Sequence, residues 1–247
     1  MALLSVNVNK IATLRNARGK DRPNLLEESL KLIGYGAQGI TVHPRPDGRH
    51  IRWPDVIELR QNIDVELNIE GYPSLHFLEK IDQIRPAQCT LVPDPPDVLT
   101  SNAGWKVFGN EELLRDKITR IKEAGVRTSL FIDPDTIEMK ELLILRDMGL
   151  DRVELYTEAY ADSYGSEKQE AVTKHYAHCA QLCDSMGLEV NAGHDLSAQN
   201  LAYFAAHIPE LKEVSIGHAL VCDALEWGWK TTLETYLKCL TPSYIMT

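Results

Sequence analysis

The feature that most constrains this chain is a regular alternation of short apolar segments with longer amphipathic ones. The short segments are β-prone, and the longer ones repeat their apolar positions with the period of an α-helix. Eight predicted strands occupy residues 3–8, 39–42, 65–69, 88–92, 127–132, 152–156, 188–191 and 213–216. Predicted helices occupy residues 25–33, 54–61, 73–81, 111–124, 137–148, 168–186, 196–206 and 232–240. Eight βα units predict a parallel sheet that closes into a single (β/α)8 TIM barrel.

One domain is predicted to span residues 1–247, because this length suits such a barrel and no linker interrupts the pattern. Two segments, 104–110 and 163–170, are predicted to carry extra helix. The irregular stretch after the fourth strand, which ends near Gly109, is longer than an ordinary connection and is predicted to be a lid.

The composition argues against several classes of protein. The formal net charge is -10, and an acidic surface argues against nucleic-acid binding. No segment approaches the roughly 20 apolar residues of a membrane-spanning helix, and the first residues do not form a secretory signal. The five cysteines are odd in number and scattered, which favours a reducing cytoplasm over a disulfide framework. One predicted helix contains His175, His178, Cys179 and Cys183, for which core packing is preferred to a metal site.

Polar side chains follow almost every predicted strand at its carboxyl end. In a parallel barrel these ends share one face, where active sites lie. The polar residues and glycines at the strand ends include Asn7, Asn9, His43, Arg45, Glu70, Thr100, Asp133, Glu154, His194, Gly217 and His218. One polar group at one strand end carries little information, whereas polar groups at nearly every end predict a polar pocket.

The loop after the second strand has the densest group of charges. Between positions 43 and 50 its prolines and glycine exclude helix and produce a bent, extended loop. A solvated loop whose charges pair with one another is the simple interpretation. The cluster as a whole favours chemistry on an anionic substrate, with His43, Arg45 and His50 as the expected contacts.

The residue types at the strand ends favour acid–base chemistry. No lysine ends a predicted strand, which disfavours an enzyme Schiff base. Glu70 ends an apolar strand and is either a general base or a structural partner of an arginine. His43 and His194 come from opposite sides of the barrel, as catalytic groups for two faces of one substrate or as hydrogen-bonded pocket histidines.

Gly193 and Gly217 follow strands seven and eight, and each stands beside a histidine. Barrels often bind a phosphate there, although tight turns also use glycine. Metal ligation by His43, Glu70 and His194 is disfavoured, because their spacing matches no metal-binding motif, and no cofactor is predicted.

With these residues in place, the chain resembles the pyridoxine 5'-phosphate synthase family over essentially its whole length. The matching motifs are VNVN at 6–9, IATLRNARG at 11–19, GITVHPR at 39–45, RHI at 49–51, LNIE at 67–70, LVP at 91–93, SLFID at 129–133, VNAGH at 190–194 and IGHA at 216–219. The resemblance implies a barrel with added helices, assembled as a homo-octamer. It also implies condensation of 3-amino-2-oxopropyl phosphate with 1-deoxy-D-xylulose 5-phosphate to give pyridoxine 5'-phosphate, inorganic phosphate and water.

The resemblance assigns roles to matching positions. His43 and Glu70 would accept protons, and His194 would donate one. Glu154 would stabilise charged intermediates. The residues expected to hold the amino-ketone phosphate are Asn7, Arg18, Asp195, Gly217 and His218. Those expected to hold the deoxyxylulose phosphate are Arg45, His50 and, on the lid, Thr100.

The chain departs from the family pattern near the expected phosphates. At two positions that contact the sugar substrate, the family usually has aspartate and histidine where this chain has Asn9 and Lys10. It commonly has glycine where Asp195 stands and often where Glu158 stands, and glycine and arginine in place of Cys222 and Asp223. Two alternatives therefore remain: a diverged barrel enzyme that acts on another phosphorylated aldehyde or ketone, and a catalytically silent paralogue.

Overall fold

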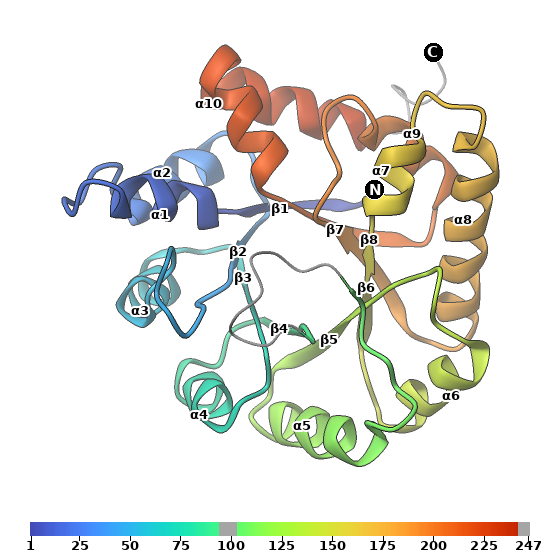
Figure 1. The fold of residues 1–247 in the computed structure, drawn as a ribbon. Helices are drawn as coiled ribbons and strands as arrows, with labels where there is room; N and C mark the ends of the chain where they lie inside the picture. The colour runs from blue at the N-terminus through green and yellow to red at the C-terminus, as the bar shows by residue number, and fades with distance from the viewer. Residues whose placement is uncertain (94–102, 242–247) are drawn as a thin grey trace.

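A computed structural model of the chain describes residues 1–93 and 103–241. Eight parallel strands form a closed barrel in sequence order, and β8 pairs with β1 (Figure 1). The strands are β1 (Leu3–Asn7), β2 (Gly39–Val42), β3 (Glu66–Gly71), β4 (Gln88–Leu91), β5 (Arg127–Ile132), β6 (Arg152–Tyr156), β7 (Glu189–Gly193) and β8 (Leu211–Ile216). The predicted barrel is therefore confirmed, and every strand lies where the apolar segments placed it.

Helices surround these strands (Figure 1). They are α1 (Asn9–Asn16), α2 (Leu25–Gly34), α3 (Trp53–Asn62), α4 (Leu75–Ile84), α5 (Glu111–Glu123), α6 (Met139–Asp147), α7 (Glu158–Ser163), α8 (Gln169–Ser185), α9 (Leu201–His207) and α10 (His218–Cys239). Side-chain caps fix some of their starts: Asn24 accepts the Glu27 N–H at 2.8 Å, and Ser74 accepts the Phe77 N–H at 3.2 Å. None of the helices in the described ranges has the length and apolar character to cross a membrane.

Helix boundaries differ from the sequence predictions at both ends of the chain. α1 was not predicted, because its buried face includes Arg15 beside Ile11 and Ala12 and so lacks an apolar stripe. α10 begins directly after β8 rather than at residue 232, and its two halves meet at a kink at Gly228, where φ is 74°. The first half exposes Leu225 and gives no helical apolar period.

Two further helix predictions are corrected in the middle of the chain. α9 begins at Leu201 rather than at residue 196, because residues 198–200 form a turn. Segment 104–110 is not helical: Trp105 and Val107 are buried while Lys106 and Phe108 are exposed, the alternation of an extended segment. Extra helix does occur just before residues 163–170, as α7. The predicted lid falls largely on residues 94–102, outside the described residues.

A polar layer inside the barrel positions the site above it. The Ser5 and Thr41 hydroxyls lie 2.8 Å apart, Asn68 donates to Thr41 at 3.4 Å, and Thr90 donates to Asn68 at 3.1 Å. All four side chains are buried, and buried polar groups of this kind need such partners. Side chains two apart on a strand share a face. The next inward layer therefore supplies pocket residues, namely Asn7, His43, Glu70, Val92, Phe131, Glu154 and Ser215.

The opposite end of the barrel is closed by paired charges. Arg127 binds Glu66, and Arg152 binds Glu189 at 2.6 Å. Both arginines also donate to the side-chain oxygen of Gln88, at 3.0 and 3.1 Å. Charges at this end therefore satisfy one another, whereas those at the carboxyl ends of the strands face a cavity.

Candidate active site

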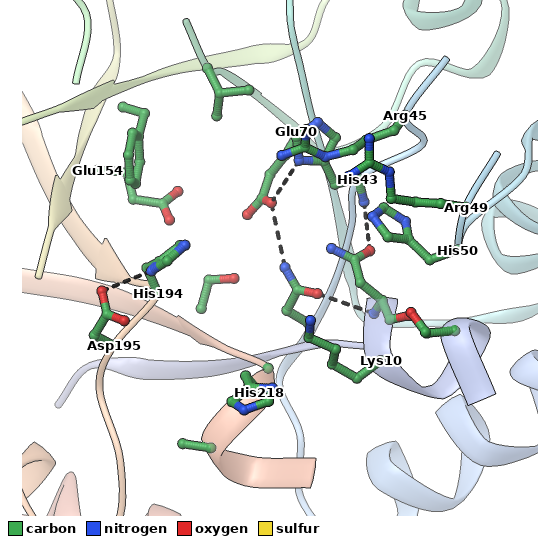
Figure 2. A pocket seen from close by; sticks show the side chains of 18 residues that line it. Lys10, His43, Arg45, Arg49, His50, Glu70, Glu154, His194, Asp195 and His218 are labelled. Carbon is green, nitrogen blue, oxygen red and sulfur yellow. Dashed lines mark hydrogen bonds and ion pairs between the residues drawn. The ribbon is translucent and has the colours of Figure 1, made fainter. Parts of the chain in front are cut away.

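A cavity of about 730 Å³ lies at the carboxyl ends of the strands (Figure 2). The predicted site residues that line it are Asn7, Asn9, Lys10, His43, Arg45, His50, Glu70, Glu154, His194, Asp195, Gly217 and His218. Arg18 does not line the cavity; it is exposed, two residues beyond the end of α1. Thr100 lies outside the described residues. The structure thus brings almost the whole predicted set into one pocket.

Some lining residues were not selected from the sequence. Val92, Phe131 and Ser215 each lie two residues after an inward-facing polar residue, so the strand period alone could have identified them. Thr13 could not be found, because α1 was not predicted. Arg49 belonged to the charged loop but was not among its selected contacts.

One wall of the pocket is a ring of hydrogen bonds around Glu70. Asn7 donates to the Glu70 carboxylate at 3.4 Å and accepts the Asn9 N–H at 3.1 Å. The Asn9 side chain accepts the His43 N–H at 2.9 Å. His43 Nδ1 lies 3.9 Å from Glu70 Oε2 (Figure 2). The ring fixes the relative positions of two groups that can take protons from a substrate.

The environment of His43 favours its neutral form. Burial lowers the pKa of His43 well below 6.5, and the charges of Arg45, His50 and Arg49 lower it further. A neutral imidazole has a lone pair available, so His43 can accept a proton at neutral pH.

His50 is also held neutral, and its tautomer follows from its contacts. Burial and the charges of Arg45 and Arg49 lower the pKa of His50 to about 4. Its Nδ1 accepts the Ile51 N–H at 2.9 Å. A neutral ring that accepts at Nδ1 carries its proton on Nε2, so His50 presents a hydrogen-bond donor.

The loop that carries His50 is tied to α1. Arg15 makes two hydrogen bonds to the Asp55 carboxylate, at 2.6 and 2.8 Å, and joins α1 to the start of α3. The Asn16 amide donates to the carbonyl oxygens of Arg49 and His50 at 3.1 and 2.8 Å. The positions of both loop residues in the pocket therefore depend on α1.

Glu154 projects from β6 into the interior and is only 4% exposed. Burial raises its pKa well above 4.5, and the neighbouring Glu70 and Glu213 raise it further. Its Oε2 has no hydrogen-bond partner among the described residues. A Cβ atom on Gly193 would lie 2.8 Å from its Oε1, so glycine at that position makes room for this carboxyl. Glu154 is therefore a neutral acid at the floor of the pocket.

His194 is held in the opposite protonation state to His43. Burial by itself would lower the pKa of His194, but the Asp195 carboxylate, 2.8 Å from Nδ1, outweighs burial and raises it above 6.5. Its backbone φ is +80°, which costs a residue other than glycine about 1–3 kcal/mol and is typical of functional sites. Tyr156 packs edge-on against the ring, with centroids 5.3 Å apart.

The N-terminus of α10 forms another wall. Gly217, His218 and Ala219 line the cavity there. A Cβ atom on Gly217 would lie 2.9 Å from the Asn7 carbonyl oxygen, so this close approach requires glycine. Unpaired N–H groups and the helix dipole make such a helix start favourable for an anion.

The departures from the family pattern have structural explanations. Glu158 accepts a hydrogen bond from the Tyr156 hydroxyl at 2.7 Å, and Asp223 accepts one from the Tyr236 hydroxyl at 2.7 Å. Neither carboxylate lines the cavity. Cys222 Sγ lies 3.7 Å from His218 Nε2. The negative charges of Glu158 and Asp223 are thus engaged by tyrosines rather than directed at the pocket.

The structure also bears on lysine and metal chemistry. Lys10 is the second residue of α1 rather than part of a loop, and it lines the pocket. Among residues 1–93 and 103–241, no three histidine, cysteine or acidic side chains are arranged to hold a metal ion.

Comparisons with known proteins agree with this geometry. A sequence model described as "Pyridoxal phosphate biosynthesis protein PdxJ" matches residues 4–242. A protein of Parabacteroides distasonis named pyridoxine 5'-phosphate synthase is 48% identical over 240 residues, covering 97% of this chain and 99% of the relative. One of the same name from Porphyromonas gingivalis is 51% identical over 236 residues, covering 96% and 98%.

Solved structures show the fold alone. The tryptophan synthase A-subunit of Pyrococcus furiosus is similar with a TM-score of 0.64 at 15% identity, covering 96% of this chain and 97% of that one. Phosphoribosylanthranilate isomerase of Thermotoga maritima has a TM-score of 0.58 at 12% identity, with coverage of 97% and 98%. With barrel, pocket and sequence match in agreement, the chain belongs to the family of the pyridoxal phosphate biosynthesis protein PdxJ.

Proposed function

We propose that this protein is a pyridoxine 5'-phosphate synthase, which condenses 3-amino-2-oxopropyl phosphate with 1-deoxy-D-xylulose 5-phosphate. The observation that carries the proposal is one pocket that holds a neutral histidine, His43, together with a histidine favoured in its protonated form, His194. Relatives that are 48–51% identical carry this name. Ring formation requires protons to be taken from carbon and given to departing oxygens, so a base and an acid must face one substrate.

The two substrates each carry a phosphate, and the pocket has two regions that favour anions. Lys10, Arg45 and Arg49 supply positive charge on one side, with the Nε2 donor of His50 among them. The start of α10 at Gly217 supplies the other. We assign the sugar phosphate to the cationic side and the amino-ketone phosphate to the helix start. Inorganic phosphate would leave as a product.

The pocket residues divide the proton transfers among them. The substrate amine forms the C=N bond with the sugar carbonyl, so the reaction needs no enzyme lysine. His43 and Glu70 take protons from substrate carbon atoms, and His194 gives one to a departing oxygen. Glu154 lacks a charge in this environment, so it stabilises developing negative charge as a hydrogen-bond donor rather than as a carboxylate.

Removal of the principal base or acid is expected to abolish turnover. Glu70→Gln and His194→Asn should each lower kcat about 10²- to 10⁴-fold, because each removes one proton-transfer group. Asparagine tolerates the positive φ of position 194 and so keeps the turn. The measurement is the rate of pyridoxine 5'-phosphate formation from the two named phosphates. Glu79→Gln, on the exposed side of α4, should retain activity. A wild-type protein that forms no product with both substrates would refute the proposal.

The link between α1 and the charged loop is expected to control binding of the sugar phosphate. Asn16→Asp replaces a donor to two carbonyl oxygens by an acceptor that repels them. Loss of hydrogen bonds worth about 1 kcal/mol each should raise KM for 1-deoxy-D-xylulose 5-phosphate roughly 5- to 30-fold, with a smaller change in KM for the amino-ketone. Steady-state kinetics with each substrate varied in turn measures both, and equal effects on the two would contradict the assignment.

Glu154→Gln separates a neutral acid from a carboxylate. The folded-state pKa of Glu154 is raised, so the wild-type carboxyl loses stability as pH rises above 4.5 toward that pKa. Glutamine does not titrate and so avoids this loss, which is about 1.4 kcal/mol for each tenfold rise in the proton affinity of the carboxyl. Glu154→Gln should therefore raise the thermal unfolding midpoint more at pH 8 than at pH 5, and should keep more activity than Glu154→Ala. Glu234→Gln, exposed on α10, should change neither midpoint. An equal effect of Glu154→Gln at both pH values would disprove the neutral form.

We further propose that the protein acts in the cytoplasm as a homo-octamer. Free thiols at all five cysteines support a reducing compartment. Exposed apolar side chains on the first half of α10, Leu225 at 79% and Trp227 at 44%, are available for burial between subunits. Light scattering of the purified protein should give eight times the mass of one chain, and a monomeric mass would contradict the assembly.

A further inference from the structure

Asp195 stands beside His194 in a turn that few sequences make. Adjacent side chains on an extended strand point to opposite faces. Here the positive φ of His194 turns the chain directly after β7 and brings the Asp195 carboxylate to 2.8 Å from His194 Nδ1 (Figure 2). The pair therefore depends on backbone geometry as well as on residue type.

The main chain of Asp195 is fixed on both sides. Its N–H donates to the Thr157 hydroxyl at 3.1 Å and to the Gly193 carbonyl at 3.2 Å. Its carbonyl oxygen accepts the Asn200 side chain at 3.3 Å. The N–H is thus already engaged within the protein, and the side chain is bonded to a histidine. Both observations disfavour a phosphate ligand at this position.

We propose that Asp195 is a positioning residue of the reaction, which holds the His194 imidazole with Nδ1 as a donor and keeps Nε2 protonated toward the cavity. The inference rests on the proposed function in taking His194 as the proton donor. An aspartate in contact with one ring nitrogen fixes the orientation of the ring and stabilises its cationic form, so that the other nitrogen can give its proton to a departing oxygen.

The groups around His194 agree in sign with this role. Asp195 is its nearest carboxylate, and Glu70 on β3 and Glu158 on α7 also favour the cation. Glu154 on β6 is held neutral, and Tyr156 and Phe131 contribute ring surfaces with centroids 5.3 and 6.5 Å away. Burial opposes the cation, and Asp195 provides the largest opposing effect.

The family commonly has glycine at position 195, which offers no carboxylate. The aspartate is therefore a feature of this chain that extends the pH range over which the acid stays protonated. We expect the activity of the wild-type protein to persist to higher pH than that of its Asp195→Gly variant.

Asp195→Asn tests the role with little change in volume, and Asp195→Gly provides a second variant should asparagine disturb the turn. Asp184→Asn is the matched control, because it removes the same charge from an exposed position on α8. The first readout is the NMR titration of the His194 ring in the absence of substrates, with the signal assigned by its loss in His194→Asn. The second is kcat and KM for each substrate from pH 6 to 9.

Both Asp195 variants should lower the pKa of His194 by about one unit or more, whereas Asp184→Asn should leave it unchanged. The basic limb of the kcat profile should shift by the same amount, so that kcat falls about tenfold at pH 8 and less than twofold at pH 6, with KM nearly constant.

An unchanged His194 titration in both variants would overturn the inference. So would a rise in KM for the amino-ketone phosphate at constant kcat, which would make Asp195 a substrate ligand. Failure of the proposed function looks different: the wild-type protein would then form no product, while the titration would still report the Asp195–His194 contact.

Discussion

Burial of ionisable groups at the mouth of the barrel is the constraint on which the site depends. Burial disfavours the charged form of His43, Glu154 and His194 alike. The three differ in the charge beside them. Arg45 adds to the effect of burial at His43, and Glu70 adds to it at Glu154. Only at His194 does a carboxylate, that of Asp195, reverse it.

The fold places these groups through strand periodicity and two helices. A hydrogen-bonded layer of small polar side chains fixes the first four strands, and the next inward position on each enters the pocket. α1 holds the charged loop through Asn16 and Arg15. α10 presents its N-terminus at Gly217 to the same cavity. Each wall of the pocket therefore rests on an element whose position is set by packing or hydrogen bonds.

Strong periodic signals predicted the barrel and most of the pocket. Apolar runs located every strand, and polar residues at their ends located His43, Glu70 and His194. α1 and the first half of α10 were not found, because the former buries Arg15 and the latter exposes Leu225. Short amphipathic helices packed on a barrel do not need a clear apolar stripe.

Contacts that depend on backbone detail were beyond sequence reasoning. Aspartate after a histidine suggests added negative charge near a phosphate, whereas the positive φ of His194 turns Asp195 onto the ring. Glu158 and Asp223 likewise suggest charge near a phosphate, yet both accept hydrogen bonds from tyrosines. Protonation was hidden too, since the neutral form of Glu154 follows from burial beside other carboxyl groups.

Neutron diffraction from a deuterated crystal near neutral pD tests the assignment of protons most directly. We expect deuterium on both ring nitrogens of His194, on only one nitrogen of His43, and on the carboxyl of Glu154. A singly deuterated His194 or a doubly deuterated His43 would contradict the central claim that one buried pocket holds two histidines in opposite protonation states.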